Sequence, residues 1–292
     1  MSVGFITKSA PWVFLLLWCG GFTVAKIGFT GAEPFTLLSV RYFSVVLCLL
    51  PCLLFVRPAF PNGLRAWLHV AWVGFLIQVI YFGAAWVAMN NGGSAASVAL
   101  ITSLQPILVA LALPYISNER VSLKGWFGLF LGLIGCVWVI LANNEVELVS
   151  MSVFVFAVLA LLGMSLATVW EKRYGVSHHI IVSSLIQYSV GFMCTLPVAM
   201  LTETMRIELS PSFLFALAYL VLCNSILAIS LLLMMIRQGE VTRVTSLFFL
   251  VPPGTALIAL LVLGEPMHPL AWVGMLVAVS GVWLVGRAGK LR

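Results

Sequence analysis

Hydrophobic residues occur in ten long runs along the chain, and polar residues separate these runs at short intervals. Each run is close to the roughly 20 apolar residues that an α-helix needs to cross the hydrocarbon core of a bilayer. The runs span Pro11–Phe29, Pro34–Val56, Leu68–Met89, Gly93–Tyr115, Leu123–Ala142, Met151–Trp170, Ile180–Leu201, Ser212–Met235, Val241–Leu263 and Pro269–Gly286. This pattern predicts an all-α integral membrane protein with ten transmembrane helices and no room for a soluble domain.

The second half of the chain repeats the first at a constant offset of 146 residues. Matching pairs include Gly93 with Gly239, Pro106 with Pro252, Trp126 with Trp272 and Gly135 with Gly281. Such a period indicates a duplicated unit, and we assign its two copies to residues 1–146 and 147–292 of one compact membrane domain. Five crossings per copy is an odd number. The second copy is therefore expected to enter the membrane from the opposite side, which is an inverted-topology repeat.

The positive charges predict how the helices are oriented. If the amino terminus is cytoplasmic, 12 of the 15 Lys and Arg residues fall in inner segments and only Arg206 falls in an outer loop. This bias follows the positive-inside rule and predicts that both termini are cytoplasmic. With 62% hydrophobic residues and a mean hydropathy of +1.15, the chain is too apolar for a soluble domain. The net charge of +6 is therefore read as topology and not as nucleic-acid binding.

Polar side chains at mid-membrane depth are costly unless they find partners or line water, so each is a candidate for substrate binding. Gln78 and Asn224 occupy related depths in the third and eighth runs, and Tyr81 lies on the same helix face as Gln78. We favour cavity lining for these residues, with interhelical hydrogen bonding as the alternative. The weaker candidates for substrate binding are Gln105, Met164 and Tyr188.

The first run places Trp18, Phe22 and Lys26 on one helix face. An indole at the midplane with an ammonium above it could hold an amphipathic zwitterion, although Lys26 could equally extend to the interface. Arg41, deep in the second run, cannot lose its charge and must find carbonyls, a glutamate such as Glu265, or substrate. We expect a structural role for Arg41 over substrate contact.

Prolines and glycines predict where helices bend and touch. Pro106 in the fourth run and Pro252–Pro253 in the ninth must interrupt backbone hydrogen bonding, and we assign them gating or hinge roles. Stripes of small residues in the fifth and tenth runs allow close backbone approach, and these two helices are expected to brace the halves. The stripes include Gly128, Gly132, Gly274 and Gly281.

Most tryptophans lie near the ends of the runs, where an interfacial aromatic belt is expected. They are Trp12, Trp67, Trp72, Trp86, Trp126, Trp138, Trp170, Trp272 and Trp283. Trp18 differs, because it lies near the middle of its run. We therefore interpret Trp18 as a candidate cavity residue and the others as belt residues.

One motif occurs twice: an apolar helix with a proline, a glutamate thirteen residues later, and a glycine-rich helix. It comprises Pro106 and Glu119 in the first half, and Pro252 and Glu265 in the second. With Trp18, Lys26 and Arg41 near the start, the chain resembles the EamA families of the drug/metabolite transporter superfamily over essentially its whole length. The resemblance implies a ten-helix transporter with a central cavity, usually an exporter of small metabolites, with amino-acid exporters, including aromatic ones, as the nearest analogy. Glu119 and Glu265 are taken as structural.

The chain contains no Asp, and every Glu lies in a loop or at a helix end. Ion-coupled pumps usually keep a carboxylate in the membrane, so we expect facilitated export by alternating access. A lipid-linked substrate flippase or a proton-coupled drug or cation exporter is the alternative. No layer of the membrane collects a nucleophile with a base, so no enzyme is expected. We expect no cofactor, metal or nucleic acid, a small-molecule substrate, a monomer or weak homodimer, and the bacterial inner membrane as location.

Overall fold

The computed structural model describes residues 3–115, 120–142, 150–175, 178–238, 241–263 and 268–288. Within these ranges ten helical segments are long and apolar enough to cross a membrane, which confirms the predicted all-α fold with ten spans. Six spans are single helices: α1 (Val3–Phe29), α2 (Pro34–Val56), α7 (Leu123–Ala142), α8 (Met151–Tyr174), α9 (Ile180–Thr202) and α14 (Pro269–Arg287). Glu119 and Glu265 lie outside the described residues.

The other four spans change helix type or break partway across. The third span joins α3 (Leu64–Gly74), the π-helical segment η1 (Phe75–Tyr81) and α4 (Phe82–Asn90). The fourth joins α5 (Ala95–Thr102), α6 (Gln105–Ala112) and η2 (Leu113–Tyr115). The eighth joins α10 (Pro211–Ala218), the π-helical segment η3 (Tyr219–Ala228) and α11 (Ile229–Gln238), and the ninth joins α12 (Val241–Thr245), η4 (Ser246–Leu250) and α13 (Val251–Leu263).

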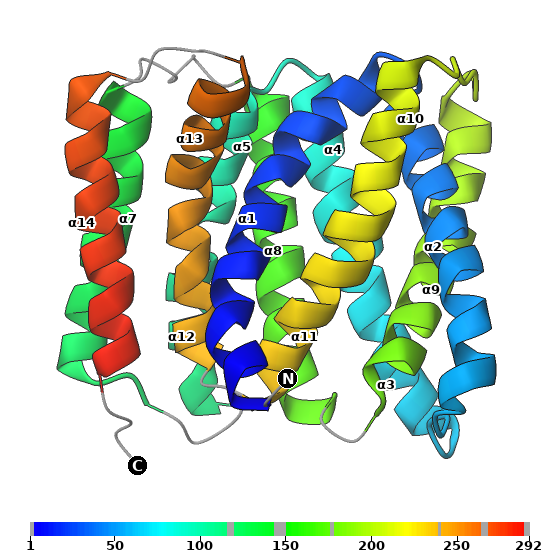
Figure 1. Cartoon of the computed structure of the whole chain (residues 1–292), viewed down its shortest axis with the longest axis horizontal. Coiled ribbons are helices and arrows are strands. Elements are labelled where there is room, and N and C mark those ends of the chain that lie inside the picture. The colour runs from blue at the N-terminus through cyan, green and yellow to red at the C-terminus, as the bar shows by residue number, and fades with distance from the viewer. Residues whose placement is uncertain are drawn as a thin grey trace.

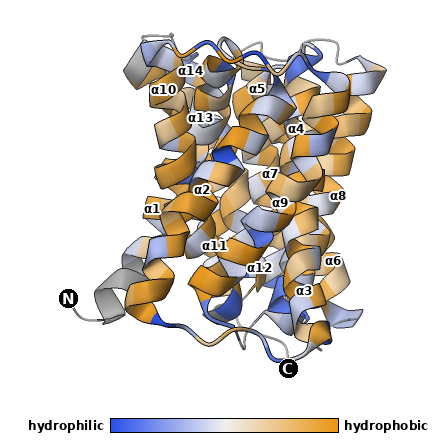
Figure 2. Cartoon of the chain, turned by 90° about the vertical axis from the view of Figure 1, so that its right-hand side faces the viewer, coloured by the Kyte–Doolittle hydropathy of each residue, from blue (hydrophilic) through white to orange (hydrophobic). Residues whose placement is uncertain are grey.

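The helices stand side by side and alternate in direction (Figure 1). α1 begins and α14 ends at the same end of the bundle, which we call the lower end after its place in Figure 1. Hydrophobic residues cover the helices along their length, and hydrophilic residues gather at the upper and lower ends (Figure 2). Large apolar side chains such as Leu54, Leu166 and Leu276 are exposed on the outer surface of the bundle. The outer surface of the bundle is therefore apolar, as expected of a protein that faces lipid.

Glycines let α7 and α14 touch through their backbones. A Cβ added at Gly281 would lie 2.3 Å from the backbone nitrogen of Gly132, and one added at Gly135 would lie 2.2 Å from that of Ala278. Gly128 and Gly274 are equally confined by the opposite helix. α7 lies in the first half of the chain and α14 in the second, so these contacts join the halves along one side of the bundle.

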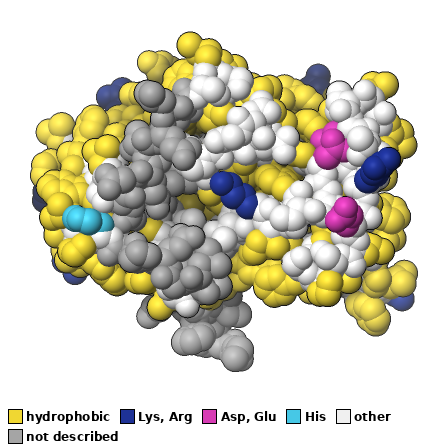
Figure 3. Space-filling model, turned by 90° about the horizontal axis from the view of Figure 1, so that it is seen from above, with side chains coloured by type: hydrophobic (Ala, Val, Ile, Leu, Met, Phe, Trp, Pro, Cys, Tyr) yellow, Lys and Arg dark blue, Asp and Glu magenta, His cyan; other side chains and the backbone are white. Residues whose placement is uncertain are grey.

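Two carboxylates join α2 to α9 at the upper end. Glu203, which follows α9, accepts hydrogen bonds from the backbone N–H groups of Phe35 and Thr36 at 2.8 and 2.7 Å, at the start of α2. In return, Glu33, just before α2, accepts hydrogen bonds from the amide and the hydroxyl of Thr204, both at 2.7 Å. A carboxylate at a helix N-terminus also meets the positive end of the helix dipole. We call this reciprocal arrangement the carboxylate clasp. Acidic side chains lie near one end of the upper face (Figure 3).

The clasp makes a small part of the stability dependent on pH. Hydrogen bonds from the Thr204 hydroxyl and amide hold the pKa of Glu33 below its usual value of 4.5. A carboxylate whose pKa is lowered by folding stabilises the fold above its unfolded pKa, and this contribution is lost as the pH falls through the lower, folded value. We expect Glu33→Gln to lower the melting temperature at neutral pH, and the difference from wild type to shrink below pH 4.5. Glu208→Gln, at an exposed position of the loop between α9 and α10, is the control, and a pH-independent difference would contradict the assignment.

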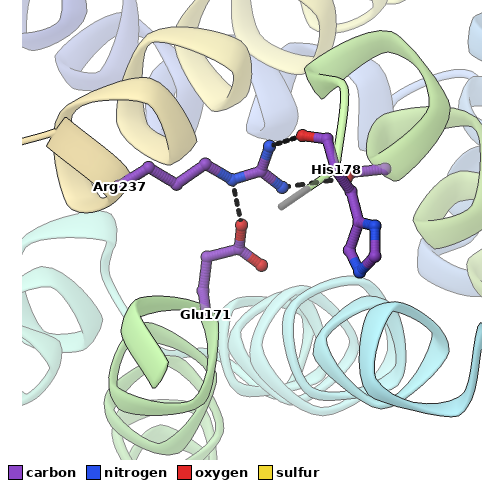
Figure 4. Close-up of polar contacts among 4 residues, drawn as sticks. Glu171, His178 and Arg237 are labelled. Atoms are coloured by element: carbon purple, nitrogen blue, oxygen red, sulfur yellow. Dashed lines mark hydrogen bonds and ion pairs between the residues drawn. The ribbon is translucent and has the colours of Figure 1, made fainter. Parts of the chain in front are cut away.

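A second polar network ties α8, α9 and α11 at the lower end. The Arg237 guanidinium donates to Glu171 at 2.5 Å and to the Ser183 hydroxyl at 2.8 Å, and also to the backbone carbonyl of His178 (Figure 4). Burial and the nearby charges of Arg237 and His69 lower the pKa of His178. We call this network the arginine node. It satisfies a carboxylate that is only 1% exposed, as a buried charge requires.

Candidate substrate-binding site

Two π-helical segments shape the centre of the bundle. η1 carries Gln78, and η3 carries Asn224 and Ser225. The hydroxyl of Tyr42 donates to the backbone carbonyl of Gln78 at 2.7 Å, and the hydroxyl of Tyr188 donates to that of Ser225 at 3.0 Å. A π-helical turn disturbs the regular carbonyl ladder and often marks a functional position. Here each such segment is held by a tyrosine from α2 or α9.

Arg41 lies fully buried beside the second π-helical segment. Its Nε donates to the Ser225 hydroxyl at 2.7 Å and its Nη2 to the side-chain oxygen of Asn224 at 2.8 Å. Its Nη1 has no hydrogen bond of normal geometry among the described residues, although the Tyr188 hydroxyl lies near the guanidinium. In the described part of the chain no carboxylate pairs with Arg41. The guanidinium instead packs over the ring of Phe82 at 4.3 Å and that of Trp86 at 5.5 Å.

Aromatic rings complete the wall around this charge. Trp18 stacks on Tyr81, with ring centroids 6.1 Å apart and planes inclined by 20°, and it also packs against Phe82 and Phe248. Glycine at position 21 leaves space for the Asn224 amide, because an added Cβ would lie 2.5 Å from its nitrogen. The wall consists of Trp18, Gly21, Phe22, Arg41, Tyr81, Phe82, Ala85, Trp86, Leu220 and Asn224. We call this the Arg41 cavity.

The Arg41 cavity is too small for a metabolite in this conformation. Its volume is about 10 Å³, room for about one water molecule. A groove of about 540 Å³ is lined by α7 and Leu270 of α14, but its wall is wholly apolar. It offers nothing that would orient a polar ligand. The Arg41 cavity is therefore the better candidate, and it must widen to admit a metabolite.

The helix breaks predicted around the prolines are present. The fourth span leaves helical form between Thr102 and Gln105, directly before Pro106. The ninth span passes through the 3₁₀ segment η4 directly before Pro252 and Pro253, which lie in the first turn of α13. Whether these breaks act as gates stays a prediction.

A second polar layer lies between α6 and α8. The Gln105 amide nitrogen donates to the Thr168 hydroxyl at 2.9 Å, and this hydroxyl donates to the backbone carbonyl of Met164 at 2.8 Å. Among the residues that the structure describes, the Gln105 amide oxygen has no hydrogen-bond partner, and neither do the two amide atoms of the buried Gln187. Each such buried polar atom without a partner is costly to the stability of this conformation.

The structure brings some of the predicted residues together and separates others. Trp18, Tyr81 and Asn224 share the Arg41 cavity. Gln78 is buried behind it, and its side-chain amide approaches the Tyr188 hydroxyl without a hydrogen bond of normal geometry. Lys26 is exposed and is not part of the wall. Gln105 and Met164 are buried in the layer between α6 and α8, whereas Tyr188 is buried next to Arg41 and Ser225 without being part of the wall.

The interpretation of Trp86 as a belt residue was wrong. Its side chain is only 2% exposed and packs against the Arg41 guanidinium. Its position near the end of a run suggested an interface, but the spacing of four residues from Phe82 places both rings on one helix face. That spacing, together with a deep arginine in the preceding run, is a signal that could have identified the pair.

Comparison with known proteins supports one type of activity. A family model described as the EamA-like transporter family matches the chain twice, over residues 10–141 and over residues 151–287. The two matches fall one in each half of the chain.

Curated relatives cover nearly the whole chain at low identity. A protein of Escherichia coli (strain K12) described as the uncharacterized inner membrane transporter YedA is 24% identical over 279 residues, covering 94% of this chain and 89% of the relative. A probable amino-acid metabolite efflux pump of Salmonella typhimurium is 23% identical over 281 residues, covering 92% and 91%. A solved crystal structure superposes with a TM-score of 0.79 at 16% identity over 96% of both chains, which shows the fold alone.

Proposed function

This chain belongs to the EamA-like transporter family, and we propose that it exports small amphipathic metabolites that carry a carboxylate, the class that includes the amino acids. Arg41 is the observation that carries the proposal. It is a fully buried guanidinium with an unpartnered Nη1 and no carboxylate partner in the described ranges. A buried charge is costly unless it is paired. A substrate carboxylate would supply the missing partner, and the surrounding rings would hold an apolar body.

Transport requires the Arg41 cavity to open alternately to each side. We infer that residues 1–146 and 147–292 form two oppositely inserted units that rock about the Arg41 cavity. The interrupted fourth and ninth spans would supply the moving gates, because their backbone hydrogen bonding is already broken. The positive-inside bias of the sequence assigns the lower end to the cytoplasm, so that substrate would load from there.

The exporter needs no ion coupling under this proposal. Glu171, in the last turn of α8 at the lower end, is a buried carboxylate, but it is paired with Arg237 of α11. It is therefore placed to fasten helices and not to meet a substrate held by Arg41. A substrate-dependent proton flux in sealed vesicles, absent from vesicles without the protein, would contradict facilitated export.

The most direct test is efflux from preloaded proteoliposomes across a panel of amino acids and other small carboxylates, with nucleosides and cationic drugs as contrasts. Saturable efflux confined to carboxylates would support the proposal. Efflux of the contrasts alone would overturn it, and flux that never saturates would indicate a channel.

Trp18 allows a matched test of the cavity on a single helix. We expect Trp18→Ala to lower saturable efflux by about ten-fold, since the ring is a wall of the site and aromatic burial contributes a large share of ligand binding. Trp12→Ala is the control, because the Trp12 ring is 63% exposed on the outside of the same helix. Both variants should remain folded by size-exclusion chromatography. Equal losses of efflux in the two variants would remove Trp18 from the site.

A further inference from the structure

Two residues of the Arg41 cavity wall, Arg41 and Asn224, carry hydrogen-bond donors that a substrate could use. Arginine can only donate, so the Asn224 side chain must turn its oxygen toward Arg41, as the 2.8 Å bond requires. The Asn224 nitrogen, a donor, is left beside Gly21. The unpartnered Arg41 Nη1 is a second donor. Arg41 and Asn224 both line the cavity, and two N–H donors can bind the two oxygens of a carboxylate.

No negative charge balances Arg41 within the described part of this wall. Glu33, Glu203 and Glu208 lie at the upper end, and Glu171 is held by Arg237 at the lower end. The two aromatic rings nearest the guanidinium are not available to a second cation. The Phe82 and Trp86 rings are already engaged by the Arg41 guanidinium. An ammonium group entering this site would therefore find no carboxylate among the described wall residues, and it would lie near the positive charge of Arg41.

We propose that the site selects amphipathic monoanions, meaning carboxylates with an aromatic or apolar body and no ammonium group, over zwitterionic amino acids of the same shape. This inference rests on the proposed function and narrows its substrate class. A monoanion neutralises Arg41 and leaves no charge unpaired. A zwitterion pairs its carboxylate but buries an unpaired ammonium, and an amine adds a like charge to the site.

Charge selection also determines what drives transport. A carrier that moves a monoanion without a compensating ion moves one negative charge per cycle. The inside-negative potential of a bacterial membrane favours the outward movement of that charge. Export could then proceed uphill to a limited extent without proton coupling, which agrees with the absence of Asp from the chain.

Three compounds of one shape test the inference on the purified full-length protein at neutral pH. 3-Phenylpropionate carries only the carboxylate, phenylalanine carries both groups, and 2-phenylethylamine carries only the ammonium. Affinities are taken from the ligand-dependent rise in melting temperature. We expect 3-phenylpropionate to bind at least about ten-fold more tightly than phenylalanine, and 2-phenylethylamine not to bind. Arg41→Gln should abolish the preference, whereas Arg65→Gln, at an exposed position of α3, should retain it.

The outcomes separate this inference from the proposed function. Equal or tighter binding of phenylalanine overturns the selection of monoanions but leaves a carboxylate exporter in place. Binding of 2-phenylethylamine overturns the selection as well. If neither carboxylate binds and the efflux panel shows no carboxylate transport, both proposals fail. If Arg41→Gln still bound 3-phenylpropionate more tightly than phenylalanine, another residue would cause the preference. That result too would overturn the inference.

Discussion

Arg41→Gln should lower saturable transport by about 100-fold while leaving the melting temperature unchanged or raised. The loss follows from the charge-assisted hydrogen bonds to a substrate carboxylate, because truncating one partner of a buried charge pair costs about 2–5 kcal/mol. The stability should not fall, because the substitution removes a buried charge that no carboxylate balances in the described residues. Proteoliposome efflux and thermal unfolding of the same preparations measure the two effects.

The opposite signs of the two effects distinguish function from structure. Arg65→Gln controls for the loss of a positive charge, since Arg65 is exposed. If Arg41→Gln instead lowers the melting temperature strongly, and transport falls only in proportion to the folded protein lost, then the structural role expected from the sequence is correct. In that case the guanidinium serves mainly to hold Asn224 and Ser225 in η3.

Gly281→Ala should destabilise the protein by about 2 kcal/mol or more, near the upper part of the range for overpacked positions. The added Cβ would lie 2.3 Å from the backbone nitrogen of Gly132. Backbone atoms cannot move aside as a flexible side chain can, so α7 and α14 must separate. Yield of folded protein and thermal unfolding in detergent are the measurements.

Gly286→Ala is a matched control in the same helix. Its added Cβ would meet nothing closer than the Arg243 side chain at 3.4 Å. Alanine is favoured over glycine in a helix by about 1 kcal/mol, so this variant should be neutral or more stable. Equal behaviour of the two variants would mean that the contact between α7 and α14 does not limit stability.

The helix positions could be predicted because lipid imposes one simple rule on the sequence. Every backbone polar group in the bilayer must be satisfied within a helix, so each span has to be a long apolar run. The bounds of α2 and α7 therefore match the predicted ranges, Pro34–Val56 and Leu123–Ala142. Pro106 and Pro252 gave the breaks, because proline cannot donate the hydrogen bond that would continue the helix.

The π-helical segments could not be predicted in this way. An α-helix and a π-helix have the same apolar composition, and the difference arises from tertiary contacts such as those of Tyr42 and Tyr188 with backbone carbonyls. The hydrogen-bond partners of Arg41 could not be predicted from the sequence either. Its partners Asn224 and Ser225 come from the other half of the chain, more than 180 positions away. The position of Arg41 deep within an apolar run indicated a costly buried charge. Only the assembled bundle shows that no carboxylate of the described helices pairs with it.

The two ends of the bundle are fastened by unrelated chemistry, although the halves are copies. The repeat partners of Glu33 and Glu203 in the carboxylate clasp are His179 and Arg57, and those of Glu171 and Arg237 in the arginine node are Ala25 and Asn91. Neither fastening has a twin in the other half. If the proposed alternating-access mechanism is correct, a substitution in one fastening is expected to loosen one end alone and to shift the balance between the inward-facing and outward-facing states. The proposed two-unit transporter would then have different energies for opening at its two ends, and substitutions at either end could alter the direction of transport without contacting the substrate.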